Sequence, residues 1–188
     1  MTSRLVIFGP PGAGKGTQAE RLAAHLSIPT ISTGELFRGH MREGTELGHL
    51  AASYISRGEL VPDSVTVDML KDRLQDPDTS RGFLLDGFPR NTAQVELLDE
   101  LLGDKRLDGV IELAVDEEAI VERLLKRGEL EGRSDDTEDV IRERLRVYSE
   151  QTAPVAALYK ERGLLTTVDG MGEIDEVTQR LIAAVDAQ

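Results

Sequence analysis

The sequence predicts an α/β fold in which five parallel strands form one sheet with helices on both of its faces. Short apolar runs alternate along the chain with longer amphipathic segments, and this alternation implies crossover connections between parallel strands. A glycine-rich stretch follows the first apolar run, at the edge where such sheets usually bind ligands. No internal repeat or linker divides the 188 residues, so a single domain is expected.

Five apolar runs have the length and hydrophobicity of strands that are buried on both faces. They cover residues 5–8, 30–32, 83–85, 110–115 and 164–168. The amphipathic segments between the runs predict helices. These segments cover residues 16–26, 36–57 in two pieces broken near Gly44, 64–74, 92–102, 117–126, 137 to about 160, and 174–185.

The segment between the second and third predicted strands breaks this alternation. It is about 50 residues long and carries three helical patterns, more than one crossover connection needs. We therefore predict a small helical insertion at residues 33–61, beside a core made of residues 1–32, 62–127 and 133–188.

The stretch GPPGAGKGT, residues 9–17, joins the first strand to the first helix. This context predicts a phosphate-binding loop (P-loop), in which main-chain N–H groups surround phosphate oxygens at a helix N-terminus. Lys15 would then reach the β and γ phosphates of a nucleotide. A purely structural glycine turn is the alternative. The N–H groups come from Gly12, Ala13, Gly14, Lys15 and Gly16.

The loop departs from the generic fingerprint in one position. A Ser or Thr normally follows the lysine directly and binds magnesium, but here Gly16 follows and Thr17 comes one residue later. We therefore expect Thr17 to meet Mg²⁺ through water. A signalling GTPase is disfavoured because Asn91 is the only asparagine, so no Asn-Lys-x-Asp guanine-binding motif is present.

A second informative stretch is GFLLDGFPRNTAQ, residues 82–94. Its strand residues deliver Asp86 to the carboxyl edge of the sheet, where the carboxylate is expected to face phosphates and, through water, magnesium. The alternative is an acid that closes a turn or caps a helix. Arg90 follows on the loop, and Gln94 lies one helical turn further on, where a glutamine can pair with an adenine edge. The isomer of the Phe88–Pro89 bond stays open.

Four arginines lie in the region that begins with the predicted helix at residues 117–126. Arg123 and Arg127 lie four residues apart on one helix face, where they repel each other unless an anion lies between them. Arg133 follows a short loop and Arg144 lies on the next helix. The alternative is a set of surface arginines neutralised by the acids nearby. Those acids are Glu129, Glu131, Asp135 and Asp136; Arg142 and Arg146 are expected to be solvated.

Five stretches together closely resemble the adenylate kinase family. They are GPPGAGKGTQA, STGELFR, GELV, LLDGFPR with a glutamine four residues later, and VDG, and they occur in the expected order from residue 5 to about residue 185. The resemblance implies a P-loop kinase that transfers a phosphoryl group reversibly from MgATP to AMP, giving two ADP. It also implies that the 33–61 insertion binds AMP and that residues 128–132 form a short, mobile lid. Because the chain has neither the long-form lid domain nor a cysteine, no zinc is expected.

The resemblance also implies a role for each matching residue. The expected ATP-binding residues are Gly12, Ala13, Gly14, Lys15, Gly16, Thr17, Arg123, Arg127 and Gly172. The expected AMP-binding residues are Thr33, Arg38, Glu59, Leu60, Val61, Gly87, Arg90, Gln94, Arg133 and Arg144. The expected catalytic residues are Lys15, Asp86, Arg90, Arg123, Arg133 and Arg144, with no direct protein ligand to magnesium.

Simpler interpretations stay open for several of these positions. Arg38 is equally suited to a solvated helix face, Thr33 to a helix N-cap, and Gly172 to a turn. The three histidines, His25, His40 and His49, are expected to be ordinary helix residues. No general base is required, because the phosphate of AMP is largely ionised at pH 7.

Composition limits the partners. The net charge of −13 disfavours nucleic acid and anionic membranes. The absence of cysteine agrees with a reducing compartment, and the N-terminal residues read as a strand rather than a signal peptide, so a cytoplasmic monomer is expected. Three other functions compete with adenylate kinase: a kinase for UMP, CMP or another nucleoside monophosphate, a nonenzymatic nucleotide-binding switch, and a general ATP hydrolase.

Overall fold

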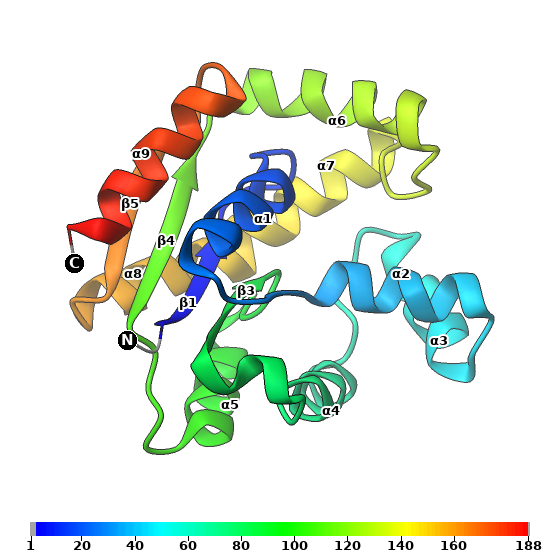
Figure 1. Ribbon diagram of the computed structural model, residues 1–188. Coiled ribbons are helices and arrows are strands. Elements are labelled where there is room, and N and C mark those ends of the chain that lie inside the picture. Colours follow the sequence, from blue (N-terminus) through cyan, green and yellow to red (C-terminus); the bar gives the residue numbers. More distant parts are fainter. Residues whose placement is uncertain (1–2, 188) are drawn as a thin grey trace.

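The computed structural model describes residues 3–187 and contains a five-stranded sheet in which every neighbouring pair is parallel (Figure 1). The strand order is β2-β3-β1-β4-β5. This confirms the predicted α/β class and places all five strands within two residues of their expected starts. The strands are β1 (Ser3–Phe8), β2 (Thr30–Ser32), β3 (Gly82–Asp86), β4 (Gly109–Ala114) and β5 (Leu165–Asp169).

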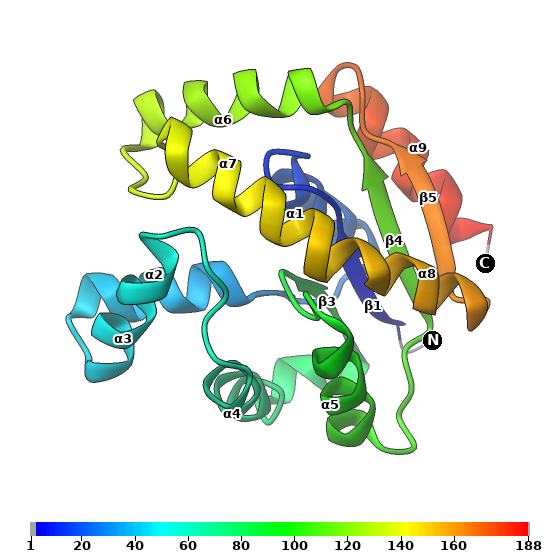
Figure 2. The same cartoon turned by 180° about the vertical axis from the view of Figure 1, so that it is seen from behind.

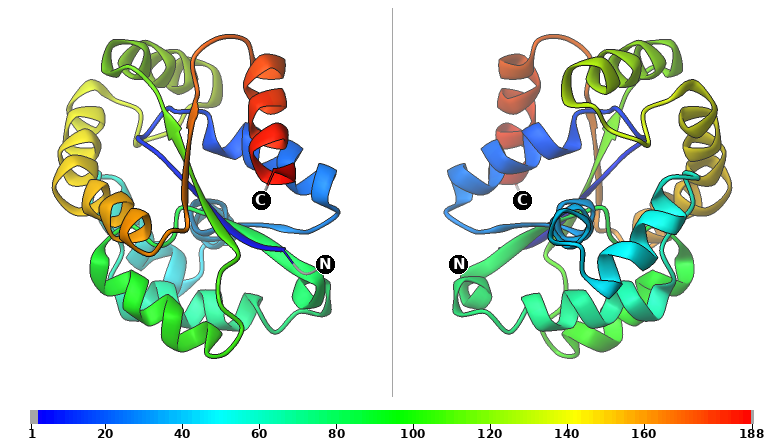
Figure 3. Two further views of the ribbon diagram at one scale, coloured as in Figure 1. Left: turned by 90° about the vertical axis from the view of Figure 1, so that its left-hand side faces the viewer. Right: turned by 90° about the vertical axis from the view of Figure 1, so that its right-hand side faces the viewer.

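Helices cover both faces of the sheet, as Figure 3 shows from two sides. They are α1 (Lys15–Leu26), α2 (Thr33–Glu43), α3 (Glu46–Ile55), α4 (Asp63–Arg73), α5 (Thr92–Leu102), α6 (Glu117–Glu131), α7 (Glu138–Val147), α8 (Ala153–Glu161) and α9 (Ile174–Asp186). A 3₁₀ turn (Pro77–Arg81) precedes β3, and a π-helical segment (Tyr148–Thr152) joins α7 to α8.

The alternation of side chains along β1 divides the core into two layers. Leu5 and Ile7 pack with α1 and α9 on one face of the sheet. Val6 and Phe8 pack with α4, α5 and α8 on the other face. Because successive strand residues point to opposite faces, one continuous apolar run supplies both layers. The three central strands, β3, β1 and β4, are therefore mostly buried, whereas β5 at the sheet's edge is partly exposed.

Helices α2 and α3 stand to the side of the sheet, at the right of Figure 1. They share a small apolar cluster formed by Phe37, Ala51 and Val61, separate from the two sheet layers. Three helices, α2 to α4, therefore fill the long connection between β2 and β3, as the sequence predicts. The role of residues 33–61 as an AMP-binding unit stays a prediction.

Two expected boundaries were wrong. Helix α6 was expected to end near residue 126, with a loop at 128–132, but it continues to Glu131. Gly128 stays helical because it packs against the main chain of Asp136, where an added Cβ would lie 2.8 Å from the carbonyl oxygen. The chain reverses only after Gly132, so residues 132–137 form the connection to α7.

The long helix expected from 137 to about 160 is interrupted. Figure 2 shows α7 and α8 following one another across the back of the sheet, with the π-helical segment between them. Pro154, near the start of α8, lacks the N–H that a regular helix would donate to the preceding turn. The wider turn avoids this missing bond, and such turns often mark functional sites. Among residues 3–187, no helix has the length and apolar character needed to cross a membrane.

Candidate active site

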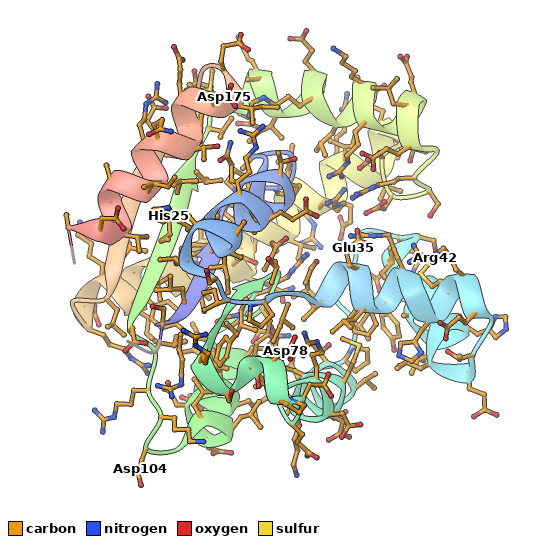
Figure 4. All side chains as sticks on the ribbon, in the orientation of Figure 1. His25, Glu35, Arg42, Asp78, Asp104 and Asp175 are labelled. Atoms are coloured by element: carbon orange, nitrogen blue, oxygen red, sulfur yellow. The ribbon has the colours of Figure 1, made fainter. Side chains whose placement is uncertain are left out.

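A large cleft opens at the carboxyl edge of the sheet, between the start of α1, the start of α2 and the facing ends of α6 and α7. Its volume is about 860 Å³, which is ample for a nucleotide. A small cavity of about 110 Å³ adjoins it and shares Lys15, Gly34, Arg38, Arg90 and Arg144 with it. Figure 4 shows all described side chains and labels Glu35 and Arg42, which line the large cleft from α2.

The P-loop forms the floor of the large cleft. Gly14 is the N-cap of α1 and has φ of 91°, in the region that favours glycine. An added Cβ on Gly14 or Gly16 would meet no protein atom within 4 Å and would project into open space. The glycines therefore leave the helix N-terminus bare, with its main-chain donors free to meet an anion.

Lys15 is the first residue of α1 and lies on this floor. Its Nζ donates to the main-chain oxygens of Gly9, at 3.0 Å, and Pro10, at 3.1 Å. Burial lowers the pKa of Lys15 to about 7, and the positive charges of Arg90 and Arg144 add to that effect while Asp86 opposes it. The charged form of Lys15 would therefore be stabilised by an anion that binds beside it.

Asp86 ends β3 and lines the large cleft, as expected. It is buried, and within residues 3–187 its carboxylate forms no hydrogen bond or ion pair. It neither closes a turn nor caps a helix, because Asn91 is the N-cap of α5. Mg²⁺ is usually held by one or two carboxylates, water and substrate phosphates. An unpartnered carboxylate opposite the P-loop fits a magnesium ion that arrives with a nucleotide.

The turn after β3 joins Arg90 to α2. Gly87 has φ of 88°, and an added Cβ would lie 2.7 Å from the hydroxyl of Thr33. The carbonyl oxygen of Gly87 accepts hydrogen bonds from that hydroxyl, at 3.0 Å, and from Nε of Arg90, at 2.7 Å. Ser32, not Thr33, is the N-cap of α2, so the N-cap interpretation of Thr33 was wrong. The Phe88–Pro89 peptide bond is cis.

On the α2 side of the cleft, Glu35 holds two of the expected phosphate-binding arginines. Its Oε1 accepts from Arg38 at 2.7 Å and lies 3.9 Å from Arg133. Figure 4 shows Glu35 between α2 and the end of α6. Burial acts to raise the pKa of Glu35, but the bonded Arg38 lowers it below its ordinary value. Arg38 is therefore not a solvated residue, and its charge is partly neutralised.

On the opposite wall, Asp136 holds two more arginines. Its side chain is fully buried and bonds both Nε and a terminal nitrogen of Arg127, at 2.6 and 2.7 Å. It also accepts from Arg144 at 2.8 Å, while Asp135 lies 3.3 Å from the same group. Burial lowers the pKa of Arg144 to about 10, which still leaves it charged at pH 7.

The sequence left open whether these arginines form an anion site or are neutralised by acids. The structure contains both arrangements. Arg123, Arg127, Arg133 and Arg144 all line the large cleft. Three of them are also paired with the acids named for the simpler interpretation, Glu131, Asp135 and Asp136. Arg123 instead lies 3.5 Å from the main-chain oxygen of Gly170.

Most expected site residues meet at these two hollows. Lys15, Arg38, Arg90 and Arg144 line both, Thr17 and Gly172 line the large cleft, and Glu59, Leu60 and Gly87 line the small cavity. Val61 packs instead in the cluster of α2 and α3. Thr33 and Gln94 are buried and line neither hollow. As expected, Arg142 and Arg146 are exposed, and no described histidine lines either hollow.

Sequence reasoning missed several residues of the site. Arg42 and Arg73 also line the large cleft, and Tyr148 and Thr152 from the π-helical segment line the small cavity. Thr152 donates to the main-chain oxygen of Arg90 at 2.5 Å. Asp63 bonds the side chain of Gln94. The sequence signal for Asp63 is weak, because its contact spans 31 positions.

The fold and the site define a P-loop kinase: a glycine-rich helix N-terminus at the edge of a parallel sheet faces a cleft rich in guanidinium groups. The profile of the family described as adenylate kinase matches residues 7–164. The chain is 55% identical over 187 residues to an adenylate kinase of Thermobifida fusca (strain YX), covering 98% of this chain and 99% of that protein.

Two further adenylate kinases give the same result. The one from Nocardioides sp. (strain ATCC BAA-499 / JS614) is 56% identical over 185 residues, covering 97% of each chain. The one from Kocuria rhizophila is 54% identical over 186 residues, covering 98% of this chain and 99% of that protein. The chain therefore belongs to the adenylate kinase family and is a phosphotransferase.

Proposed function

We propose that this chain transfers the terminal phosphoryl group of MgATP to AMP, reversibly, to give two ADP. The observation that carries the proposal is the junction of the two hollows: Lys15, Arg38, Arg90 and Arg144 line both. Two nucleotides placed one in each hollow would meet with their phosphates at the same set of cations. This arrangement suits transfer between two anions better than hydrolysis of one.

In this proposal the triphosphate of ATP lies on the P-loop. Gly12 and residues 14–17 supply the main-chain donors, whereas the N–H of Ala13 already donates to the main-chain oxygen of Pro10 at 3.1 Å. Lys15 exchanges the oxygens of Gly9 and Pro10 for phosphate oxygens. Arg123 and Arg127 approach from α6, and the loop around Gly172 lines the far end of the same cleft for the base. All these groups border the large cleft, which supports a single ATP subsite.

AMP takes the small cavity and the adjoining part of the large cleft, because the cavity alone, at about 110 Å³, is too small for a nucleotide. Arg38 and Arg90 bind its phosphate, and Arg144, together with Arg133 from the large cleft, meets the transferring group. Glu59 and Leu60 lie along the nucleoside, with Val61 packed behind them in the cluster of α2 and α3. The apolar side chains of Ile55, Leu60 and Tyr148 line the same cavity and suit a purine ring. We assign the adenine edge to Gln94, which would have to turn toward the cavity as AMP binds, because it is buried and its Oε1 accepts from the main-chain N–H of Arg90 at 2.7 Å.

The reaction needs alignment and charge neutralisation rather than a proton acceptor. An oxygen of the AMP phosphate forms a bond to the γ-phosphorus as the bond to the leaving ADP oxygen breaks. That oxygen is already ionised at pH 7, so no base is required. The arginines first paired with Glu35, Asp135 and Asp136 would turn to the phosphates, where a well-placed guanidinium can contribute about 10³-fold or more in rate.

Asp86 and Thr17 would hold magnesium through water opposite the P-loop. The ion, when bound, neutralises charge on the β and γ phosphates. Residues 128–132, at the end of α6, would move with Arg127 and Arg133 to exclude water, as a short lid. The net charge of −13 supports our further proposal that the chain binds neither nucleic acid nor anionic membranes. We also propose a cytoplasmic location, with which the absence of cysteine agrees, and a monomer as the simplest state.

One coupled assay tests this function. ADP formation from MgATP is measured with AMP, with UMP, CMP or GMP, and without any monophosphate. The proposal predicts ADP formation that depends on AMP and is much slower with the other monophosphates. Equal rates with UMP would favour a broader nucleoside monophosphate kinase, equal ATP loss without AMP would favour a hydrolase, and binding without turnover would favour a nucleotide-binding switch.

A further inference from the structure

A side-chain hydrogen bond joins the π-helical segment to the turn that carries Arg90. Thr152 is the last residue of the segment and is 5% exposed. Its hydroxyl donates to the main-chain oxygen of Arg90 at 2.5 Å, across 62 positions of the sequence. Thr152 also lines the small cavity, together with Tyr148 from the same segment. The π-helical segment therefore borders the site and also holds the main chain of Arg90.

The direction of the Thr152 hydroxyl is unusual for a threonine in a helix. Such hydroxyls commonly return to a main-chain oxygen of the preceding turn. Thr66 of α4 does this with the oxygen of Pro62, at 3.3 Å. In the π-helical segment, the oxygen of Tyr148 accepts from the main-chain N–H of Ala153, five residues later, and the Thr152 hydroxyl donates to another element. The hydroxyl thus links two elements rather than closing its own turn.

The other hydrogen bonds of Arg90 stay within its own turn and the helix that follows. Its Nε donates to the main-chain oxygen of Gly87, and its main-chain N–H donates to Oε1 of Gln94. These two bonds shape the turn between β3 and α5 and would move with it as one unit. Within residues 3–187, Thr152 supplies the one hydrogen bond that Arg90 receives from the α7–α8 side.

This bond relates Arg90 to Arg144. Arg144 lies on α7, which runs directly into the π-helical segment, and both arginines line the two hollows. Arg144 is bonded to Asp136, whereas Arg90 has only the oxygen of Gly87 as a side-chain partner. Phosphoryl transfer between two bound nucleotides requires its charged groups at a fixed separation. A hydroxyl that ties one arginine-bearing segment to the other can set this separation.

We propose that Thr152 is a positioning residue for phosphoryl transfer, which fixes Arg90 relative to Arg144 by holding the main-chain oxygen of Arg90. The proposal rests on the proposed function, in which both arginines meet the phosphates. The single hydrogen of the Thr152 hydroxyl is used by Arg90. Thr152 therefore acts through Arg90 and not directly on a phosphate.

The test compares two substitutions that differ in the hydroxyl. Thr152→Val keeps the shape of the side chain and removes the hydroxyl, whereas Thr152→Ser keeps the hydroxyl. Steady-state ADP formation from MgATP and AMP gives kcat and KM for each substrate. We expect kcat to fall about tenfold in Thr152→Val, because a small misplacement of a charged group is costly in an active site. KM for ATP should stay within about twofold, and Thr152→Ser should keep kcat within about threefold.

An Arg90→Ala background separates positioning from support of the fold. The main-chain oxygen at position 90 remains in that background, so Thr152→Val should lower the melting temperature as much as it does with Arg90 present. Its effect on kcat should shrink to less than twofold, because the guanidinium that it positions is gone. Ser149→Ala removes an exposed hydroxyl from the same segment and should change neither quantity.

An equal fall in kcat with and without the Arg90 side chain would show that Thr152 supports the fold alone, and it would overturn the proposal. An unchanged kcat in Thr152→Val, or the same loss in the valine and serine variants, would overturn it too. Failure of the proposed function would look different, because the unmodified protein would then form no ADP from AMP.

Discussion

The floor and the walls of the large cleft present positive charge in two different ways. The floor is made by the P-loop, where Gly14 and its neighbours leave main-chain donors bare and Lys15 bonds only carbonyl oxygens. The walls carry arginines whose charges are already met by carboxylates, above all Asp136. An anion can bind to the P-loop without displacing a carboxylate. To bind the arginines of the walls, it must take the place of one.

This difference suggests that the two regions bind phosphate in different ways. On the floor, the backbone geometry of the P-loop fixes where the donors lie. The walls are set by ion pairs, which form and break as α2, α6 and α7 approach a ligand. Without substrate, carboxylates also limit the repulsion among four neighbouring cations by neutralising them locally. These cations are Arg38, Arg127, Arg133 and Arg144.

Arg90→Ala should have the largest effect, because Arg90 lines both hollows and is bonded to Gly87 rather than to an acid. We expect kcat to fall at least about 100-fold, the scale of losing one positioned charge in an active site. Steady-state ADP formation measures this fall. Arg142→Ala, at an exposed position, is the matched control; a mild loss, similar to that control, would remove Arg90 from the reacting centre.

Asp136→Asn tests the walls. It leaves Arg127 and Arg144 without their buried carboxylate, which should destabilise the ligand-free protein by about 3 kcal/mol. Thermal unfolding measures the loss. Saturating ATP with AMP, or a bisubstrate analogue, supplies phosphate charge in place of the carboxylate, so the deficit should shrink on binding. A deficit that stays constant with ligand would show that these arginines never leave Asp136.

The pH dependence of Lys15 tests the floor. Burial lowers its pKa to about 7 from an ordinary value of 10.5, so between these values the unfolded chain binds more protons than the folded one. The stability of the ligand-free protein should therefore rise with pH through this window. Phosphate oxygens favour the charged form, so nucleotide binding at pH 8 should take up about one proton at this site.

Calorimetry in two buffers of different ionisation enthalpy detects that proton. At pH 8 the binding heat should depend on the buffer, and at pH 6, where Lys15 is already charged, the dependence should be small. Lys15→Arg keeps its charge at both pH values and serves as the control. Equal buffer dependence in the variant and the unchanged protein would assign the proton to another group.

Glu35→Gln should have the smallest effect. Glu35 is exposed, and exposed ion pairs contribute about 1 kcal/mol or less. Removing its charge frees Arg38 for phosphate, while Arg133 stays paired with Glu131 at 2.7 Å, so KM for AMP should fall by a factor of about two to five while kcat changes little. A rise in KM would mean that Glu35 positions these arginines rather than competing with their ligand.

Much of the fold could be predicted because its signals are local. The run at residues 5–8 is apolar at every position, as a strand buried on both faces requires, and the glycine-rich stretch marks the turn after it. The end of α6 was missed because Gly128 and Gly132 look alike in sequence. Only the contact between Gly128 and Asp136 across the reversal distinguishes them.

The site shows the same limit. The cations could be predicted from motifs, since Lys15, Arg38 and Arg90 each lie in a recognisable stretch. Their present partners could not, because Asp136 and Glu35 gain their roles only through contacts between separate elements. The burial of Gln94 against Asp63 was likewise invisible, because the two residues lie 31 positions apart.

The central claim is that phosphates replace carboxylates on the walls of one cleft. A crystal structure with a bisubstrate analogue, two adenosines joined by five phosphates, tests it most directly. We predict Lys15, Arg38, Arg90, Arg133 and Arg144 within hydrogen-bond distance of the phosphate chain, with Glu35 and Asp135 released from Arg38 and Arg144. An analogue bound by the P-loop alone, with Arg38 still on Glu35 and Arg144 still on Asp135 and Asp136, would show that no such exchange occurs.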